Sequence, residues 1–141
     1  MWGAQTELDA RTTQEVAEVN ASGRPPVVFI HGLWLLPSWD RWAQVFEDNG
    51  YAPLTPGWPD DPETVEEAKA HPEVFADKTV GQVADHYSAV IEGLNQKPAV
   101  IGQSFGGLLA QMVAGRGLSA ATVAIDAAPF RGESCRCPSR P

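Results

Sequence analysis

The 141-residue sequence predicts an α/β protein in which helices cover both faces of a mostly parallel sheet. Short apolar, β-favouring runs alternate along the chain with stretches whose apolar residues recur every three or four positions. The run at 99–101 also leads directly through a glycine-flanked serine into a helical pattern. The length is sufficient for one domain with a substantial core. We expect a single domain over residues 25–132, between a polar, weakly patterned segment at 1–24 and a tail at 133–141.

The first half of the domain contains two predicted strands and one helix. Residues 27–30 are apolar and β-favouring, which is typical of a buried parallel strand. A helix follows, with Ser38 as its cap and Gly50 at its end. Its predicted buried face consists of Trp39, Trp42, Ala43 and Phe46. Residues 51–54 form a short strand, and Pro53 argues against a fully bonded central position for it. Residues 57–72 are irregular, with His71 in solvent.

The second half continues the alternation. Thr79 and Gln82 have the spacing of a capping box. They precede a long apolar stripe made of Val80, Val83, Ala84, Tyr87, Val90, Ile91 and Leu94. His86 lies beside this stripe, and we expect it at the surface or the core boundary. Strands are predicted at 99–101 and 122–126. The helix between them has an apolar face of Phe105, Leu108, Leu109, Met112 and Val113, and its end is expected at Gly115 and Gly117.

The segment Gly102-Gln103-Ser104-Phe105-Gly106 has the pattern that presents a nucleophilic serine. A serine at a sharp strand-to-helix turn has a strained backbone, and the residues two before and two after it must be nearly free of side chain. Gly102 and Gly106 occupy those places. A glycine-rich turn with an incidental serine is the alternative. The flanking strand and helix favour the nucleophile, Ser104.

A second motif, His31-Gly32-Leu33-Trp34, follows the first predicted strand. Acyl transfer passes through a negatively charged oxygen, which two backbone N–H groups can stabilise by several kcal/mol. We expect Phe105 to supply one of these donors and Leu33 the other. We interpret His31 as an anchor of this oxyanion loop rather than as the catalytic base.

The two motifs and the strand at 122–126 followed by Ala127-Ala128-Pro129 resemble the α/β-hydrolase family, in particular its esterases, lipases and cofactor-free peroxidases. The similarity covers roughly residues 25–132 and corresponds to the third to sixth strands of the family. It implies the chain order serine, acid, histidine. All three histidines here precede Ser104. Asp126 is either a strand-end residue or an acid in an unusual place.

We therefore expect a serine hydrolase of α/β-hydrolase type, acting on an ester or related small acyl substrate, whose activity is crippled because no histidine follows the nucleophile. The alternative is a non-catalytic fragment or partner-binding module derived from such an enzyme. Trp34 and Trp58 are candidate walls of an acyl pocket, or they cover the core edge. The outer edge of the strand at 122–126 is expected to be open, which favours self-association.

Composition limits the other classes of function. A net charge of −8 and a pI near 4.7 argue against nucleic-acid binding. No run is long enough to span a membrane and no signal segment is visible, so a soluble, cytoplasmic protein is expected. The sequence matches neither a phosphate-binding loop nor a dinucleotide fingerprint, and we expect no cofactor.

The last nine residues, Glu133 to Pro141, have no apolar periodicity and contain both cysteines, Cys135 and Cys137. Two cysteines in one close pair are a weak metal signal, and free thiols in an unstructured tail are the simpler interpretation. A shift of reading frame after Gly132 would explain the change of composition. A genuine short tail is the alternative.

Overall fold

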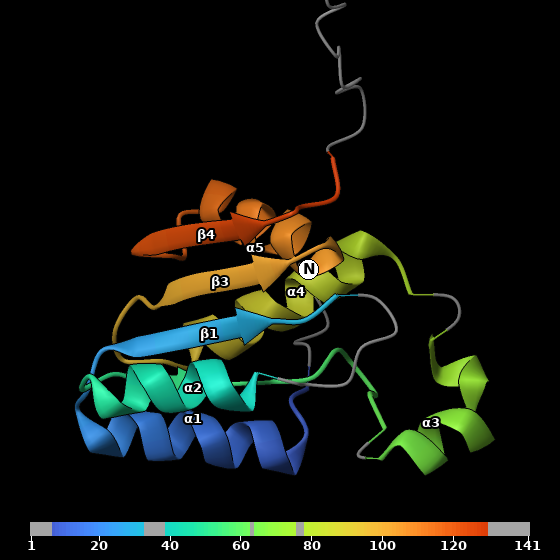
Figure 1. Cartoon of the computed structure of the whole chain (residues 1–141), viewed down its shortest axis with the longest axis horizontal. Helices are drawn as coiled ribbons and strands as arrows, with labels where there is room; N and C mark the ends of the chain where they lie inside the picture. Colours follow the sequence, from blue (N-terminus) through green and yellow to red (C-terminus); the bar gives the residue numbers. More distant parts are fainter. Residues whose placement is uncertain (1–6, 33–38, 63, 76–77, 130–141) are drawn as a thin grey trace, which may run out of the picture.

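A computed structural model describes residues 7–32, 39–62, 64–75 and 78–129. Its centre is a sheet of four strands in the order β2-β1-β3-β4, all parallel to their neighbours (Figure 1). The strands are β1 (Pro26–Ile30), β2 (Ala52–Leu54), β3 (Ala99–Gln103) and β4 (Ala121–Ile125). Because β2 lies at one edge, Pro53 does not interrupt a central ladder, as predicted. All five residues of β1 are buried.

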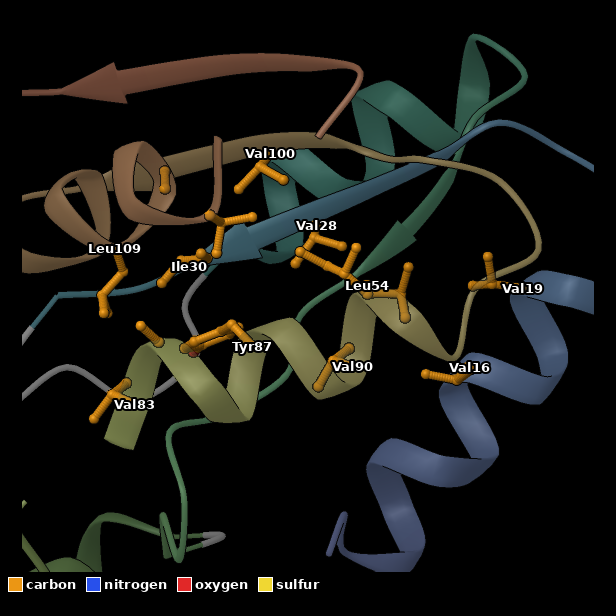
Figure 2. Close-up of a cluster of buried hydrophobic side chains, with 14 of the residues drawn as sticks. Val16, Val19, Val28, Ile30, Leu54, Val83, Tyr87, Val90, Val100 and Leu109 are labelled. Atoms are coloured by element: carbon orange, nitrogen blue, oxygen red, sulfur yellow. The ribbon is translucent and has the colours of Figure 1, made fainter. Parts of the chain in front are cut away.

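Helices cover both faces of this sheet. On one face α1 (Ala10–Ser22), α4 (Val80–Glu92) and α5 (Phe105–Gly115) close the larger core, which contains Tyr87 of α4, Leu109 of α5 and Val28 of β1 (Figure 2). On the other face α2 (Asp40–Asp48) closes a smaller core around Phe29, Trp39 and Ile101. The fold class predicted from the sequence, α/β with a parallel sheet covered on both sides, is confirmed.

Helix α1 lies within the segment where the sequence predicts no element. Asp9 caps it by accepting a hydrogen bond of 2.7 Å from the Thr12 backbone N–H. Its buried residues are Thr12, Val16 and Val19, and the two valines join the larger core. A stripe of only two buried apolar residues in a helix of 13 is too narrow for periodicity to reveal.

Helix α2 differs from the prediction at one position. Trp39, Ala43 and Phe46 pack into the smaller core, but the Trp42 side chain is 51% exposed. Trp42 forms a T-shaped contact with Trp39, with 5.9 Å between ring centroids. The predicted cap, Ser38, is outside the described residues. Asn49 ends the helix and Gly50 follows with a φ of 90°.

Helix α4 begins with the predicted capping box: Thr79 accepts from the Gln82 backbone, and the Gln82 side chain accepts from the Thr79 backbone. The expectation that His86 lies at the surface or boundary is wrong, because only 3% of this residue is exposed. The loop after β2 covers it, which periodicity within α4 alone could not indicate. His71 is exposed, as expected.

The remaining elements lie at the margins. A short helix, α3 (Val65–Ala70), occurs in the region predicted to be irregular and lies to the side of the sheet (Figure 1). A second one, η1 (Pro72–Phe75), begins at the last residue of that region. Of the two predicted terminal glycines of α5, only Gly117 has a positive φ. Among the described residues, β4 forms the other edge of the sheet, and its Val123 is 51% exposed. In the part of the chain that the structure describes, no helix is long and apolar enough to cross a membrane.

Candidate active site

Ser104 lies between the last residue of β3 and the first residue of α5. Its φ of 57° and ψ of −122° are outside the conformations that an L-residue with a side chain normally adopts. Such a backbone costs on the order of 1–3 kcal/mol and persists only where the surroundings hold it. The strain predicted for a nucleophile at this turn is therefore present at Ser104.

The two glycines that flank Ser104 are required by close backbone contacts. A Cβ atom on Gly102 would lie 2.0 Å from the carbonyl oxygen of Gly106. A Cβ atom on Gly106 would lie 2.1 Å from the carbonyl oxygen of Ile30, in β1. Strand and helix therefore cross too closely for any side chain at these two positions. This close crossing is the reason that the sequence pattern requires glycine there.

Backbone hydrogen bonds hold the turn in place from the β4 side. The Ser104 N–H donates to the Ile125 carbonyl, and the Ala128 N–H donates to the Ser104 carbonyl, both at 3.0 Å. Asp126, between them, has a φ of 46° and is exposed. The Ser104 side chain is itself exposed. The backbone of the strained serine is therefore supported by hydrogen bonds while the residue itself is exposed.

The sheet topology brings the two predicted motifs to one place. The chain leaves β1 for β2 on one side and later returns to β3 on the other, so the strand order reverses between β1 and β3. In open parallel sheets, ligands bind in the crevice outside the carboxyl ends of the strands at such a reversal. His31 and Gly32 follow β1 there, and Ser104 follows β3. Gly106 packs against the backbone of Ile30 and His31, so the two loops are in direct contact.

One of the two predicted oxyanion donors is described. Phe105 is the first residue of α5, and a backbone N–H at that position has no acceptor within its own helix. The helix dipole also favours negative charge at this end. The other donor, Leu33, and the predicted pocket residue Trp34 are outside the described residues.

His31 is buried, and both of its ring nitrogens are hydrogen-bonded. Its Nε2 lies 2.8 Å from Oδ2 of Asp61, and its Nδ1 lies 2.8 Å from the carbonyl oxygen of Gly32. Trp58 stacks on the imidazole at a ring separation of 5.9 Å, and its Nε1 donates to the His31 carbonyl. These contacts fit the interpretation of His31 as a loop anchor. They also place the Trp58 ring against His31.

Asp61 is the residue of this region that sequence reasoning missed. It lies in the loop after β2, thirty positions from its histidine partner, and is one of two adjacent aspartates. Only the tertiary structure selects Asp61 from this pair. Its Oδ2 also accepts a hydrogen bond of 2.7 Å from the Trp58 backbone N–H.

None of the three histidines is hydrogen-bonded to Ser104 among the described residues. His31 is held by Asp61, and exposed His71 pairs with Glu73. His86 donates from Nε2 to the Gly57 carbonyl. Burial lowers the pKa of His86, although that carbonyl and nearby aspartates act in the opposite direction. Ser104, the predicted nucleophile, therefore has no histidine paired with it in the described part of the site.

A cavity of about 320 Å³ lies between the start of α1 and the loop at 56–62. Its wall includes Trp58, Asp61 and His86, and no residue of the Ser104 turn lines it. Burial raises the pKa of Glu15, which also lines it.

In the described ranges no group of His, Cys, Asp or Glu is arranged to hold a metal ion. Cys135 and Cys137 lie outside those ranges.

A parallel α/β sheet with a strained serine between a central strand and a helix defines the class of proteins built around a nucleophile elbow. A family model described as the alpha/beta hydrolase family matches residues 27–140. The chain belongs to the alpha/beta hydrolase family, and the match extends beyond Gly132, where the sequence predicts the domain to end. A search of curated proteins finds no match.

Proposed function

We propose that this chain carries the nucleophile half of a serine hydrolase that acts on an ester or related acyl group. Ser104 attacks the carbonyl carbon, and the N–H groups of Phe105 and Leu33 stabilise the resulting oxyanion. The observation that carries the proposal is the backbone of Ser104, with a φ of 57° between two glycines that admit no side chain. A turn without a catalytic task has no need for a strained serine between such glycines.

The proposed reaction is limited by proton transfer. A serine hydroxyl is a weak nucleophile unless a neighbouring base accepts its proton. Because no histidine of the described residues contacts Ser104 to accept its proton, we expect acylation itself to be slow and turnover to be inefficient. Loss of the serine or the histidine of such a triad costs roughly a million-fold in turnover, while the oxyanion hole and binding retain about 10³ to 10⁴ over water.

The test uses a reactive fluorophosphonate, which forms a stable bond to an activated serine hydroxyl. The whole chain is incubated with the reagent at pH 7.5, and the modified peptide is identified by mass spectrometry. We expect one adduct at Ser104, formed slowly. The Ser104→Ala variant should form none at the corresponding peptide.

Ser119→Ala is the matched control. Ser119 lies in the connection before β4, and its hydroxyl is bonded to Thr122, so its removal should leave labelling unchanged. Equal labelling of many serines, or labelling that survives Ser104→Ala, would mean that the strained turn does not activate this hydroxyl. Fast turnover of a nitrophenyl ester that Ser104→Ala abolishes would instead show that a base is supplied.

A further inference from the structure

We propose that Asp126 is a specificity-determining residue, whose carboxylate beside Ser104 favours acyl substrates that carry a positive charge near the scissile bond. The proposal rests on the function proposed above, because Ser104 must react for such a preference to appear. It concerns the choice of substrate rather than the transfer of a proton.

The ladder between β3 and β4 places Asp126 next to Ser104. The two strands lie side by side and parallel, and Gln103 is opposite Ile125 at the end of their register (Figure 1). The next residues along the two strands are Ser104 and Asp126. The Ser104 N–H donates to the carbonyl of the residue before Asp126, and the Ser104 carbonyl accepts from the Ala128 N–H, both at 3.0 Å. Asp126 is therefore bracketed by hydrogen bonds to the backbone of the serine.

A close contact also fixes the loop that follows Asp126. A Cβ atom on Gly107, in the first turn of α5, would lie 2.8 Å from the Cβ atom of Ala127. This loop therefore packs directly against the helix that begins after Ser104. Neighbouring strands lie about 4.8 Å apart, and serine and aspartate have short side chains, so the carboxylate lies within roughly 10 Å of the Ser104 hydroxyl.

Asp126 and Ser104 share an unusual backbone conformation. Their φ angles are 46° and 57°, positive values that few residues other than glycine adopt. Aspartate tolerates such values because its side chain can bond to nearby backbone, but the carboxylate of Asp126 makes no hydrogen bond to a described residue. Strained residues cluster at active sites and ligand clamps. A charged residue that is held in this way beside the nucleophile, and that the fold does not use, indicates a contact with substrate.

The surroundings leave the charge of Asp126 available. The residue is exposed, and none of the ion pairs among the described residues includes it. The acid of a serine hydrolase triad acts through a histidine, and no described histidine is hydrogen-bonded to Asp126. The whole chain has a net charge of −8, which adds to the local negative potential. A positively charged substrate group is therefore attracted to this side of Ser104, and an anionic one is repelled.

The test compares two 4-nitrophenyl esters whose acyl groups have nearly the same shape. One carries the 4-(trimethylammonio)butanoyl group, and the other carries the 5,5-dimethylhexanoyl group, in which a quaternary carbon replaces the charged nitrogen. With either ester the bond from the Ser104 oxygen to the acyl carbon forms, the bond to nitrophenolate breaks, and the serine proton passes to water. The rate of acylation is measured on the whole chain at pH 7.5 by mass spectrometry of the Ser104 peptide.

The ratio of the cationic rate to the neutral rate is the quantity of interest. We expect Asp126→Asn to lower this ratio by about 3- to 10-fold, because one attractive charge is removed. Asparagine has nearly the same size and also tolerates a positive φ. Since both rates are measured on the same protein, an effect of the substitution on folding or on Ser104 itself cancels in the ratio. The difference between the two proteins should shrink in 1 M salt, where the screening length is about 3 Å.

Asp60→Asn provides the comparison at a similar aspartate. Asp60 is also exposed and has a φ of 60°, but it lines the cavity beside the start of α1. Its substitution removes the same charge and should leave the ratio unchanged. An unchanged ratio in Asp126→Asn, or an equal fall in both variants, overturns the role of Asp126, although acylation of Ser104 would still support the proposed function. Absence of acylation at Ser104 with both esters contradicts the proposed function, and this inference with it.

Discussion

Replacing Gly106 with alanine should destabilise the protein severely, although the change adds a single methyl group to a helix. Gly106 is the second residue of α5. The new Cβ atom would lie 2.1 Å from the Ile30 carbonyl oxygen and 2.8 Å from the His31 carbonyl oxygen. Cβ atoms essentially never approach closer than 3.0 Å. The helix would have to move away from β1 by roughly 0.9 Å to relieve the first contact.

This movement is costly because both partners are backbone. Overpacking in a core typically costs about 1–3 kcal/mol when side chains can rearrange. Here a fully buried strand and the helix that supports Ser104 must separate, so we expect at least about 3 kcal/mol. Since a domain of this kind is stable by only about 5–15 kcal/mol, the loss is a large part of the total.

Gly115→Ala is the matched control at the other end of α5. No atom lies within 4 Å of the position of its Cβ. Alanine in place of an unconstrained helical glycine should stabilise the protein by about 0.5–1 kcal/mol. The assay is urea unfolding of both variants, followed by circular dichroism and tryptophan fluorescence. A free energy of unfolding for Gly106→Ala within 1 kcal/mol of the parent would refute the reasoning, as would equal losses at both positions.

Two further expectations concern pH and association. His86 should lower the free energy of unfolding as pH decreases from 7.5 to 5.5, because the unfolded residue gains a proton near its usual pKa of 6.5 while burial lowers the pKa of the folded residue. In urea unfolding of His86→Gln, the free energy of unfolding should fall less over this pH range. Glu15, whose pKa burial raises, acts in the opposite direction in both proteins. Equal falls in the two proteins would contradict the role of His86. We also propose that the chain associates with itself through β4, whose Val123 is exposed at the sheet edge. Sedimentation velocity over a range of concentrations should show association that Val123→Lys weakens. Val45→Lys, at an exposed position on α2, should leave the association unchanged. A monomer at all concentrations would contradict the proposed association.

The elbow could be predicted because its requirements are local. The pattern has two glycines at fixed distances from a serine, between a β-favouring run and an apolar helical face. It predicts that a strand and a helix cross too closely for a side chain, and the structure has that crossing. The capping box at Thr79 and the edge position of β2 are of the same kind. Hydrogen bonds within three residues and the missing N–H of Pro53 are properties of the chain itself.

Burial by distant segments could not be predicted in this way. His86 is buried because the loop after β2 covers it, and α1 docks although its buried stripe is narrow. Trp42 has the spacing of a core residue, yet α2 packs against the sheet through Ala43 and Phe46 and leaves Trp42 exposed. In each of these cases another element determines which side of a helix meets water.

The sequence by itself determined the α/β architecture, the alternation of strands and helices, and the position of a strained serine, because periodicity, glycine and proline act over a few bonds. Only the tertiary structure decided that His31 is held between Asp61, Trp58 and the Gly32 carbonyl. The physical reason is that the order of parallel strands in space, rather than along the chain, brings the loop after β2 against the loop after β1. A contact across thirty positions depends on that packing, which no local pattern encodes.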